Sequence, residues 1–288
     1  MKRAVLILII IAALAVPTLS RPYYNGLKVI VTPQQISQGK SFLVQVFALK
    51  DMKSISGSIF DKDIIFFKQK DHFRGIIGVP VNAAPGNYKL RLNMKYEDGA
   101  ERVHDKYVRV GKGKFDKVSY WLKPQKKKLL APDLINDEWA VIQKELIKET
   151  PKKLWKGSFR IPAVGTTSMR YGAWQVINGV ARGQHMGWDI AGAEYYRVRA
   201  ANNGQVVIAE DFKVFGRTVV INHGQGIYSL YFHLSRIDVK EKEVVWKGKI
   251  IGMMGSSGVA TGTHLHWGLS VHDVRVDPMQ WVYGMVAR

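Results

Sequence analysis

Alternation of apolar and polar residues marks β-strands in the first third of the chain. Apolar side chains occupy every second position from residue 88 to residue 94, and the positions between them are polar. This period of two is typical of a strand with one buried face. Turn-forming residues at 85–87 and 97–99 frame the strand, so a second strand is expected over 101–110. We predict that residues 21–111 form an immunoglobulin-like β-sandwich.

The alternation stops after residue 111, where lysines accumulate. Residues 112–154 are interpreted as a basic linker with one helix, because four apolar residues recur there at helical spacing: Ile135, Trp139, Ile142 and Leu146. Asp133 is expected to cap this helix and Pro151 to stop it. The apolar stripe predicts packing against a neighbouring domain. The run Lys126-Lys127-Lys128 is read as solvated surface, with a polymer-binding patch as the alternative.

Strand-like segments return in the last part of the chain. Apolar runs with Gly-containing turns between them predict strands at 205–209, 218–221, 227–232 and 263–269. The fold class predicted for the whole chain is therefore mainly β. Residues 155–288 are assigned to a second, C-terminal domain.

The first 20 residues resemble an export signal. Met1-Lys2-Arg3 gives a positive start, and an uncharged apolar run from residue 4 to residue 16 ends at Pro17. The run is shorter than the ~20 residues of a membrane-spanning helix. Cleavage is expected after Ser20 or Ala15, with a retained anchor as the alternative. We therefore expect an exported protein of the cell envelope, in a periplasm or at a cell surface, that meets the membrane only transiently through this segment.

The excess of positive charge predicts an anionic environment or partner. The chain has 43 Lys and Arg against 23 Asp and Glu, a formal net charge of +20, and it has no cysteine. Disulfides and thiolate metal sites are therefore excluded. Nucleic acid is the usual partner of so basic a protein, but export makes phosphate-rich envelope polymers and acidic glycan peptides the expected partners instead.

Two short motifs carry candidate metal ligands. His185 and Asp189 are four residues apart, and Gly187 between them permits a tight backbone path. His264 and His266 fall in a strand-like run, where residues two apart point to the same face. Imidazole and carboxylate groups of this kind can bind one zinc ion together.

These motifs give the C-terminal region a specific resemblance. The pattern His-x-x-x-Asp, then Tyr-x-His-Leu, then Gly-x-His-Leu-His, closed by Asp277-Pro278, resembles the lysostaphin-type zinc metallopeptidases that cut peptidoglycan peptides. The resemblance extends through most of residues 155–281. It implies an antiparallel β-sheet metallopeptidase domain with an open groove. One departure is the stretch 171–175, where relatives often carry an arginine, and it concerns how substrate is held.

The resemblance also implies roles for individual residues. His185, Asp189 and His266 would bind one Zn²⁺ per chain, which leaves a coordination position open for water. His264 would act as general base, and His233 would hydrogen-bond the oxyanion or protonate the leaving amine.

Two further residues are candidate substrate-binding residues. Tyr231 lies two positions before His233 on the same predicted strand, so it is expected to share its face and line the groove. Asn178, in the Asn-Gly pair before the first motif, is assigned to the same role from the resemblance.

The sequence thus predicts an exported zinc endopeptidase that hydrolyses peptide bonds in peptidoglycan stem peptides or cross-bridges. One alternative is a non-catalytic envelope regulator of the same fold that activates another wall hydrolase. A second is a cationic binding protein with a structural zinc, although a closed zinc site needs a fourth protein ligand and the motifs supply three.

Overall fold

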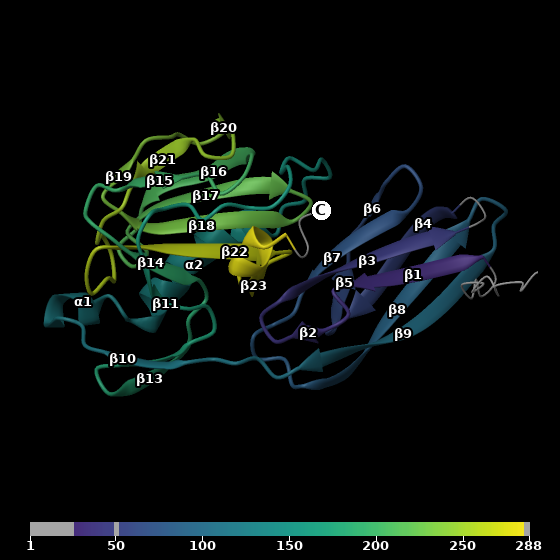
Figure 1. The fold of residues 1–288 in the computed structure, drawn as a ribbon, viewed down its shortest axis with the longest axis horizontal. Helices are drawn as coiled ribbons and strands as arrows, with labels where there is room; N and C mark the ends of the chain where they lie inside the picture. The colour runs from purple at the N-terminus through teal and green to yellow at the C-terminus, as the bar shows by residue number, and fades with distance from the viewer. Residues whose placement is uncertain (1–25, 49–51, 285–288) are drawn as a thin grey trace, which may run out of the picture.

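The computed structural model describes residues 26–48 and 52–284, and these form a mainly β structure (Figure 1). The export segment predicted at 1–20 lies outside the described residues. No helix among the described residues is long and apolar enough to span a membrane.

The N-terminal part consists of two sheets. The first has the strand order β1 (Leu27–Thr32), β3 (Ser41–Ala48), β7 (Phe73–Gly78), β6 (Phe66–Lys68), and the second has the order β2 (Ile36–Ser37), β9 (Glu101–Gly111), β8 (Gly86–Tyr96), β4 (Met52–Ile59), β5 (Lys62–Ile64). The alternation predicted at 88–94 is confirmed, since Leu90, Leu92 and Met94 of β8 are buried and the residues between them are exposed. They share a core with Phe42 and Val44 of β3, so the two sheets face each other.

The C-terminal part is built on one large antiparallel sheet. Its order is β11 (Thr166–Met169), β14 (Trp188–Ala191), β22 (His264–Val271), β18 (Ile227–Leu234), β17 (Arg217–Gly224), β16 (Gly204–Asp211), β20 (Val244–Val245), and β23 (Val274–Val276) pairs with β22. The strands predicted from residues 205, 218, 227 and 263 onward are β16, β17, β18 and β22. A small sheet of β15 (Arg197–Arg199), β21 (Ile250–Met253) and β19 (Arg236–Ile237) adjoins it.

Both faces of this sheet are covered, which explains why β18 is buried at every position. One face carries the main core, including Tyr231, Trp267 and Trp281. The other is covered by helix α2 (Pro132–Leu146), whose Ile142 and Leu146 pack on Leu230 of β18. The predicted apolar stripe thus packs as expected.

The start of α2 differs from the prediction. Its N-cap is Ala131 and Pro132 is the first helical residue, so Asp133 lies inside the first turn. There its charge favours the N-terminal end of the helix dipole without capping it.

The segment expected to be a linker is part of the C-terminal structure. β10 (Lys117–Tyr120) pairs in parallel with β12 (Trp174–Ile177), and β12 pairs with β13 (Val180–Gln184). The short helix α1 (Pro124–Lys128) places the Lys126 ammonium on the Ser256 carbonyl, 3.0 Å away. The lysine run is therefore not wholly solvated.

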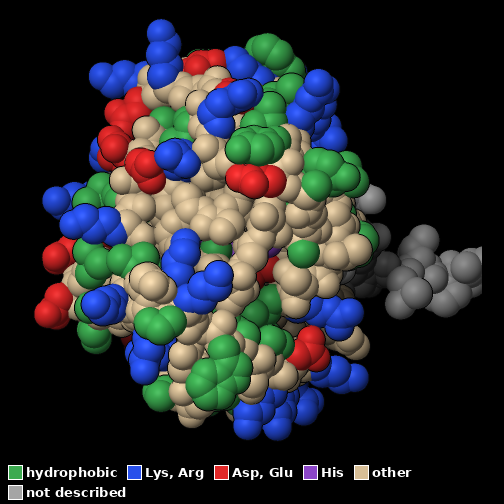
Figure 2. Space-filling model, turned by 90° about the vertical axis from the view of Figure 1, so that its left-hand side faces the viewer, with side chains coloured by type: hydrophobic (Ala, Val, Ile, Leu, Met, Phe, Trp, Pro, Cys, Tyr) green, Lys and Arg blue, Asp and Glu red, His purple; other side chains and the backbone are tan. Residues whose placement is uncertain are grey.

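The two parts of the chain are joined by polar contacts at the helix α3 (Met279–Val282). Lys40 Nζ lies 2.5 Å from the carboxylate of Asp277, and Trp281 Nε1 donates to Ser41 Oγ at 3.0 Å. Figure 2 shows lysine and arginine side chains spread over the whole left-hand face of Figure 1, so the positive charge there is distributed rather than gathered in one patch.

Candidate metal centre

Strand pairing places two of the predicted ligands side by side. Asp189 on β14 is the register partner of His266 on β22, and His264 is the partner of Ala191. Cross-strand partners in an antiparallel pair point to the same face of the sheet. His185 precedes β14, and Gly187 between them is required by close approach, since a Cβ there would lie 2.4 Å from His266 Nε2.

The three predicted ligands converge on one point. His185 Nε2 lies 3.0 Å from Asp189 Oδ1, and His266 Nδ1 lies 2.9 Å from the same oxygen. The two imidazole nitrogens are 2.9 Å apart. All three side chains are buried, so water does not separate them from one another.

The protons available to these atoms favour a cation between them. His185 Nδ1 lies 3.2 Å from the Arg170 carbonyl, which can only accept, so this nitrogen carries the proton of the neutral ring. His185 Nε2 then presents a lone pair to the Asp189 carboxylate and to His266 Nδ1. His185 Nε2, His266 Nδ1 and Asp189 Oδ1 are in contact but have at most one proton between them. A divalent cation can accept a lone pair from all three atoms. The donor set fits zinc.

The electrostatics of the group match metal binding. Burial alone would raise the pKa of Asp189, but the charge and hydrogen bonds of His185 and His266 outweigh it and hold that pKa well below its ordinary value. Burial lowers the pKa of His266 to about 4, against the opposing effect of Asp189. The carboxylate is therefore ionised and the His266 ring neutral near pH 7, the states that bind metal.

The two histidines predicted to be catalytic lie next to the three donors. His264 Nε2 is 3.8 Å from Asp189 Oδ2, and the ring centroids of His233 and His264 are 4.9 Å apart. His264 Nδ1 donates to the Gly262 carbonyl at 2.9 Å, and His233 Nδ1 donates to the Ser257 carbonyl at 2.8 Å. Burial, with a smaller effect of His264 and His266, holds the pKa of His233 well below its ordinary value. Nε2 of the neutral His233 ring is then a proton acceptor.

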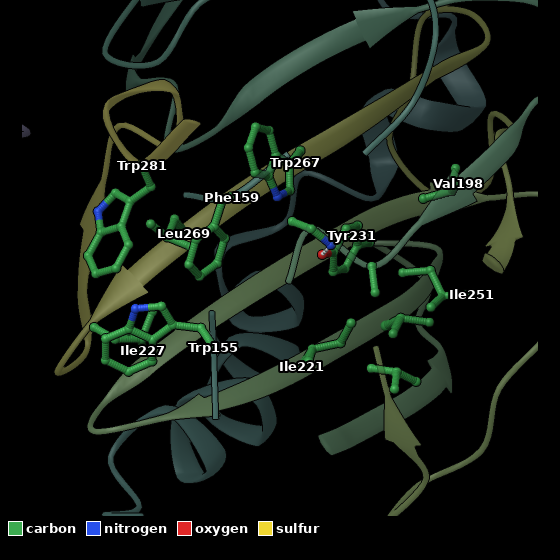
Figure 3. Packing of buried hydrophobic residues seen from close by; sticks show 14 of the residues in the cluster. Trp155, Phe159, Val198, Ile221, Ile227, Tyr231, Ile251, Trp267, Leu269 and Trp281 are labelled. Carbon is green, nitrogen blue, oxygen red and sulfur yellow. Dashed lines mark hydrogen bonds between the residues drawn. The ribbon is translucent and has the colours of Figure 1, made fainter. Parts of the chain in front are cut away.

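Tyr231 does not line the site, and this prediction was wrong. Its ring is fully buried among hydrophobic residues (Figure 3), and its hydroxyl accepts the Ala201 N–H at 2.8 Å. The cause is a register shift between β17 and β18 together with a positive φ of 64° at His233. This bulge reverses the alternation, so His233 faces the site while Tyr231 faces the opposite side of the sheet.

Asn178 also lies outside the site. Its side-chain oxygen accepts the Leu122 N–H at 2.9 Å, and its side-chain nitrogen donates to the Leu122 carbonyl at 3.2 Å. Both polar groups are thereby used to fix the chain after β10. The residue acts as a local clamp, and its assignment to substrate binding is corrected.

The space beside the metal donors has two lobes. A larger cavity of about 610 Å³ and a smaller one of about 340 Å³ both contact His185, His233 and His266. Tyr120 of β10 borders both, and Trp139 of α2 borders the larger. The predicted open groove thus has one wall built from the segment that the sequence analysis treated as a linker. These residues were missed because nothing in their local pattern relates them to the distant His motifs.

Glu138 of α2 was also missed, and it holds a loop of the site. Its buried carboxylate accepts the backbone N–H groups of Lys213, Val214 and Phe215 at 2.7, 2.9 and 3.3 Å. The Phe215 carbonyl in turn accepts the His233 N–H at 3.1 Å. Glu138 therefore connects the helix to the backbone of a predicted catalytic residue.

We expect Glu138→Ala to destabilise the protein. The substitution leaves three backbone donors without their acceptor, and a buried unsatisfied donor costs ~1–3 kcal/mol, so a loss of about 3 kcal/mol is expected after partial relaxation. Urea unfolding measures it. The matched control is Asp137→Ala, which removes the neighbouring, exposed carboxylate. Equal stability of the two variants would contradict the role given to Glu138.

The C-terminal region is similar to known proteins. The sequence profile of Peptidase family M23 matches residues 183–278. The peptidoglycan DD-endopeptidase ShyA of Vibrio cholerae is 38% identical over 96 residues, which are 33% of this chain and 22% of ShyA. The murein hydrolase activator NlpD of Salmonella dublin is 30% identical over 105 residues, 36% of this chain and 28% of NlpD. The chain thus spans less than a third of the length of these curated relatives.

A solved structure extends the likeness beyond the matched region. A crystal structure from Pseudomonas aeruginosa, assigned to peptidase M23, superposes with a TM-score of 0.64 at 25% identity. The superposition covers 86% of this chain and 95% of the other. The resemblance to M23 peptidases drawn from the motifs is confirmed.

Proposed function

We propose, from the premise that residues 183–278 belong to Peptidase family M23, that this protein is a zinc-dependent endopeptidase of peptidoglycan. The observation that carries the proposal is the convergence of His185, Asp189 and His266, with His264 and His233 beside them and not used as donors. Three ligands leave a coordination position open, as catalytic zinc sites require.

In this proposal each residue has one task. His185, Asp189 and His266 would hold zinc, which when bound polarises a peptide carbonyl and lowers the pKa of water from ~15.7 to ~7. His264 accepts the proton of the attacking water at Nε2, because its Nδ1 is engaged by the Gly262 carbonyl. His233 in its neutral tautomer has no proton at Nε2, so it would protonate the leaving amine with the proton that the attacking water has given to His264, whose ring centroid lies 4.9 Å from that of His233.

The substrate and the location follow from one relative and from the sequence. ShyA is named a peptidoglycan DD-endopeptidase. The export-like segment at 1–20 and the net charge of +20 suit an anionic cell wall outside the cytoplasm. We therefore propose peptide bonds of peptidoglycan as the substrate and the cell envelope as the location.

The likeness to NlpD supports a second candidate function, activation of another wall hydrolase. Such a role needs the fold but no catalytic site. This chain keeps all three donor residues and both neighbouring histidines, which favours the enzyme.

The variant His264→Ala tests the proposed mechanism. Because His264 is not one of the three converging donors, the variant should bind zinc like the wild type while cleaving at least ~100-fold more slowly, as expected when a general base is lost. Zinc content and cleavage of a cross-linked muropeptide are measured on the same samples. His104→Ala, in the distant β9, is the control. Unchanged cleavage in His264→Ala would reject the proposed mechanism.

A further inference from the structure

The guanidinium of Arg275 borders the larger cavity beside the metal donors. Arg275 lies on β23, and its Nη2 donates to the Met186 carbonyl at 2.5 Å, next in sequence to His185. Its Cζ lies 5.2 Å from the centroid of the Trp139 ring. The same cavity contacts His185 and His266, so a single ligand can reach both the cation and the metal centre.

Within the described part of the chain, this cation is held by no direct ion pair. No carboxylate among residues 26–48 and 52–284 forms an ion pair with Arg275, and its buried Nε has no hydrogen-bond acceptor there. Asp273, two residues earlier, lines the same cavity, and its charge raises the pKa of Arg275. Asp273 makes no ion pair with the guanidinium, and its carboxylate accepts the Gln143 amide N–H at 2.7 Å. Two other half-buried cations are paired, Lys40 with Asp277 and Lys249 with Glu243. The buried Arg74 guanidinium instead donates to the Gln225 side-chain oxygen.

Burial without a direct ion pair makes the charge costly. Burial lowers the pKa of Arg275 to about 10, so the group is still a cation near pH 7. A charge removed from water without a counter-ion destabilises the protein unless a ligand supplies the opposite charge. A carboxylate fits best, because a guanidinium donates strong, charge-assisted hydrogen bonds to carboxylate oxygens.

We propose that Arg275 binds a free carboxylate of the peptide substrate in the larger cavity, and so selects substrates that carry one close to the scissile bond. The proposal rests on the proposed peptidase function and deepens it by naming a recognition element. The carboxylate is either the C-terminal group of a stem peptide or a side-chain group within it. Arg275 is thus a specificity residue, with no part in the proton transfers.

The test uses matched peptides. One cross-linked peptide has all its carboxylates free, a second has the C-terminal carboxylate as an amide, and a third has the side-chain carboxylate as an amide. For the wild type, one of the two amides should raise KM and lower kcat/KM at least ~10-fold, the equivalent of about 1.4 kcal/mol. Which amide has this effect identifies the source of the carboxylate.

The variant Arg275→Gln should lose this preference. On the amidated peptide that the wild type cleaves poorly, the kcat/KM of the variant should stay within about threefold of the wild-type value. On the peptide with free carboxylates, the kcat/KM of the variant should fall to that same low value. Zinc content should not change. Arg182→Gln, on the exposed strand β13, is the charge-matched control and should behave as the wild type. If Arg275→Gln does not fold, Arg275→Lys should retain a reduced preference, because it keeps the charge and loses the planar fork.

Two results would overturn the proposal: a wild type indifferent to both amides, or an Arg275→Gln variant impaired equally on all peptides, which indicates a structural clamp. Failure of the peptidase function is distinguishable, since no peptide would then be cleaved. Titration calorimetry with the same peptides would in that case test the site alone. At least ~10-fold tighter binding of the free peptide, lost in Arg275→Gln, would support it, and equal affinities would reject it.

Discussion

The variant His266→Ala is expected to lose both zinc and cleavage activity. His266 contributes one of three donor atoms, and its neighbours His185 and Asp189 cannot complete the site alone. Loss of an outer partner of a ligand costs ~10–100-fold in metal affinity, so loss of a ligand itself should cost more than ~100-fold. Zinc bound after dialysis is measured by atomic absorption, and cleavage on the same sample.

A variant of His104, which lies far from the metal centre, provides the control. His104→Ala should keep one zinc per chain and full cleavage, because His104 lies on β9 of the N-terminal sheets. If His266→Ala retained stoichiometric zinc, the three-donor site would be wrong. If it lost zinc but still cleaved, the role given to the metal would be wrong.

Acid is expected to destabilise the fold through His223. This residue is fully buried, with Nδ1 2.7 Å from the Asn203 carbonyl and Nε2 2.7 Å from Ser229 Oγ. Burial lowers the pKa of His223 from 6.5 to about 4. A lowered histidine pKa means that the unfolded chain binds more protons than the folded one between these values, so stability falls as the pH falls through this window.

The loss of unfolding free energy from about pH 7.5 to about pH 4 should reach roughly 3 kcal/mol for His223. Urea unfolding of the metal-free protein at both pH values measures it. His223→Gln should be less stable near neutral pH, but its stability should fall less on acidification by that amount. His104→Ala should keep the wild-type pH dependence. If His223→Gln also kept it, the buried neutral state of His223 would be contradicted.

Local sequence patterns predicted the strands and the metal motif well. Alternation predicted the position of β8, and apolar runs predicted the positions of β16 to β18 and β22. The pattern of a single strand depends mainly on which of its faces is buried. The spacing His-x-His put both rings on one face of β22. The register pairing of Asp189 with His266 was beyond local patterns. The resemblance implied only that both residues bind one zinc.

Other features depend on contacts between distant segments. The bulge at His233 places His233 and Tyr231 on opposite faces of the sheet. A strict period of two places them on the same face. The segment 112–154 was interpreted as a linker because its own sequence does not show the contacts it makes, which are the pairing of β10 with β12 and the packing of α2 on the C-terminal sheet. For the same reason Glu138 and Arg275 could not be singled out from their own neighbourhoods.

The most direct test of the proposed function is mass spectrometry of purified peptidoglycan after digestion with the zinc-loaded protein. Chelator-treated protein and His266→Ala serve as controls. We expect new peptide termini with the zinc-loaded wild type only, and their masses identify the bond that is cut. Intact peptidoglycan after treatment with protein that demonstrably holds zinc would contradict the endopeptidase, and would favour the activator.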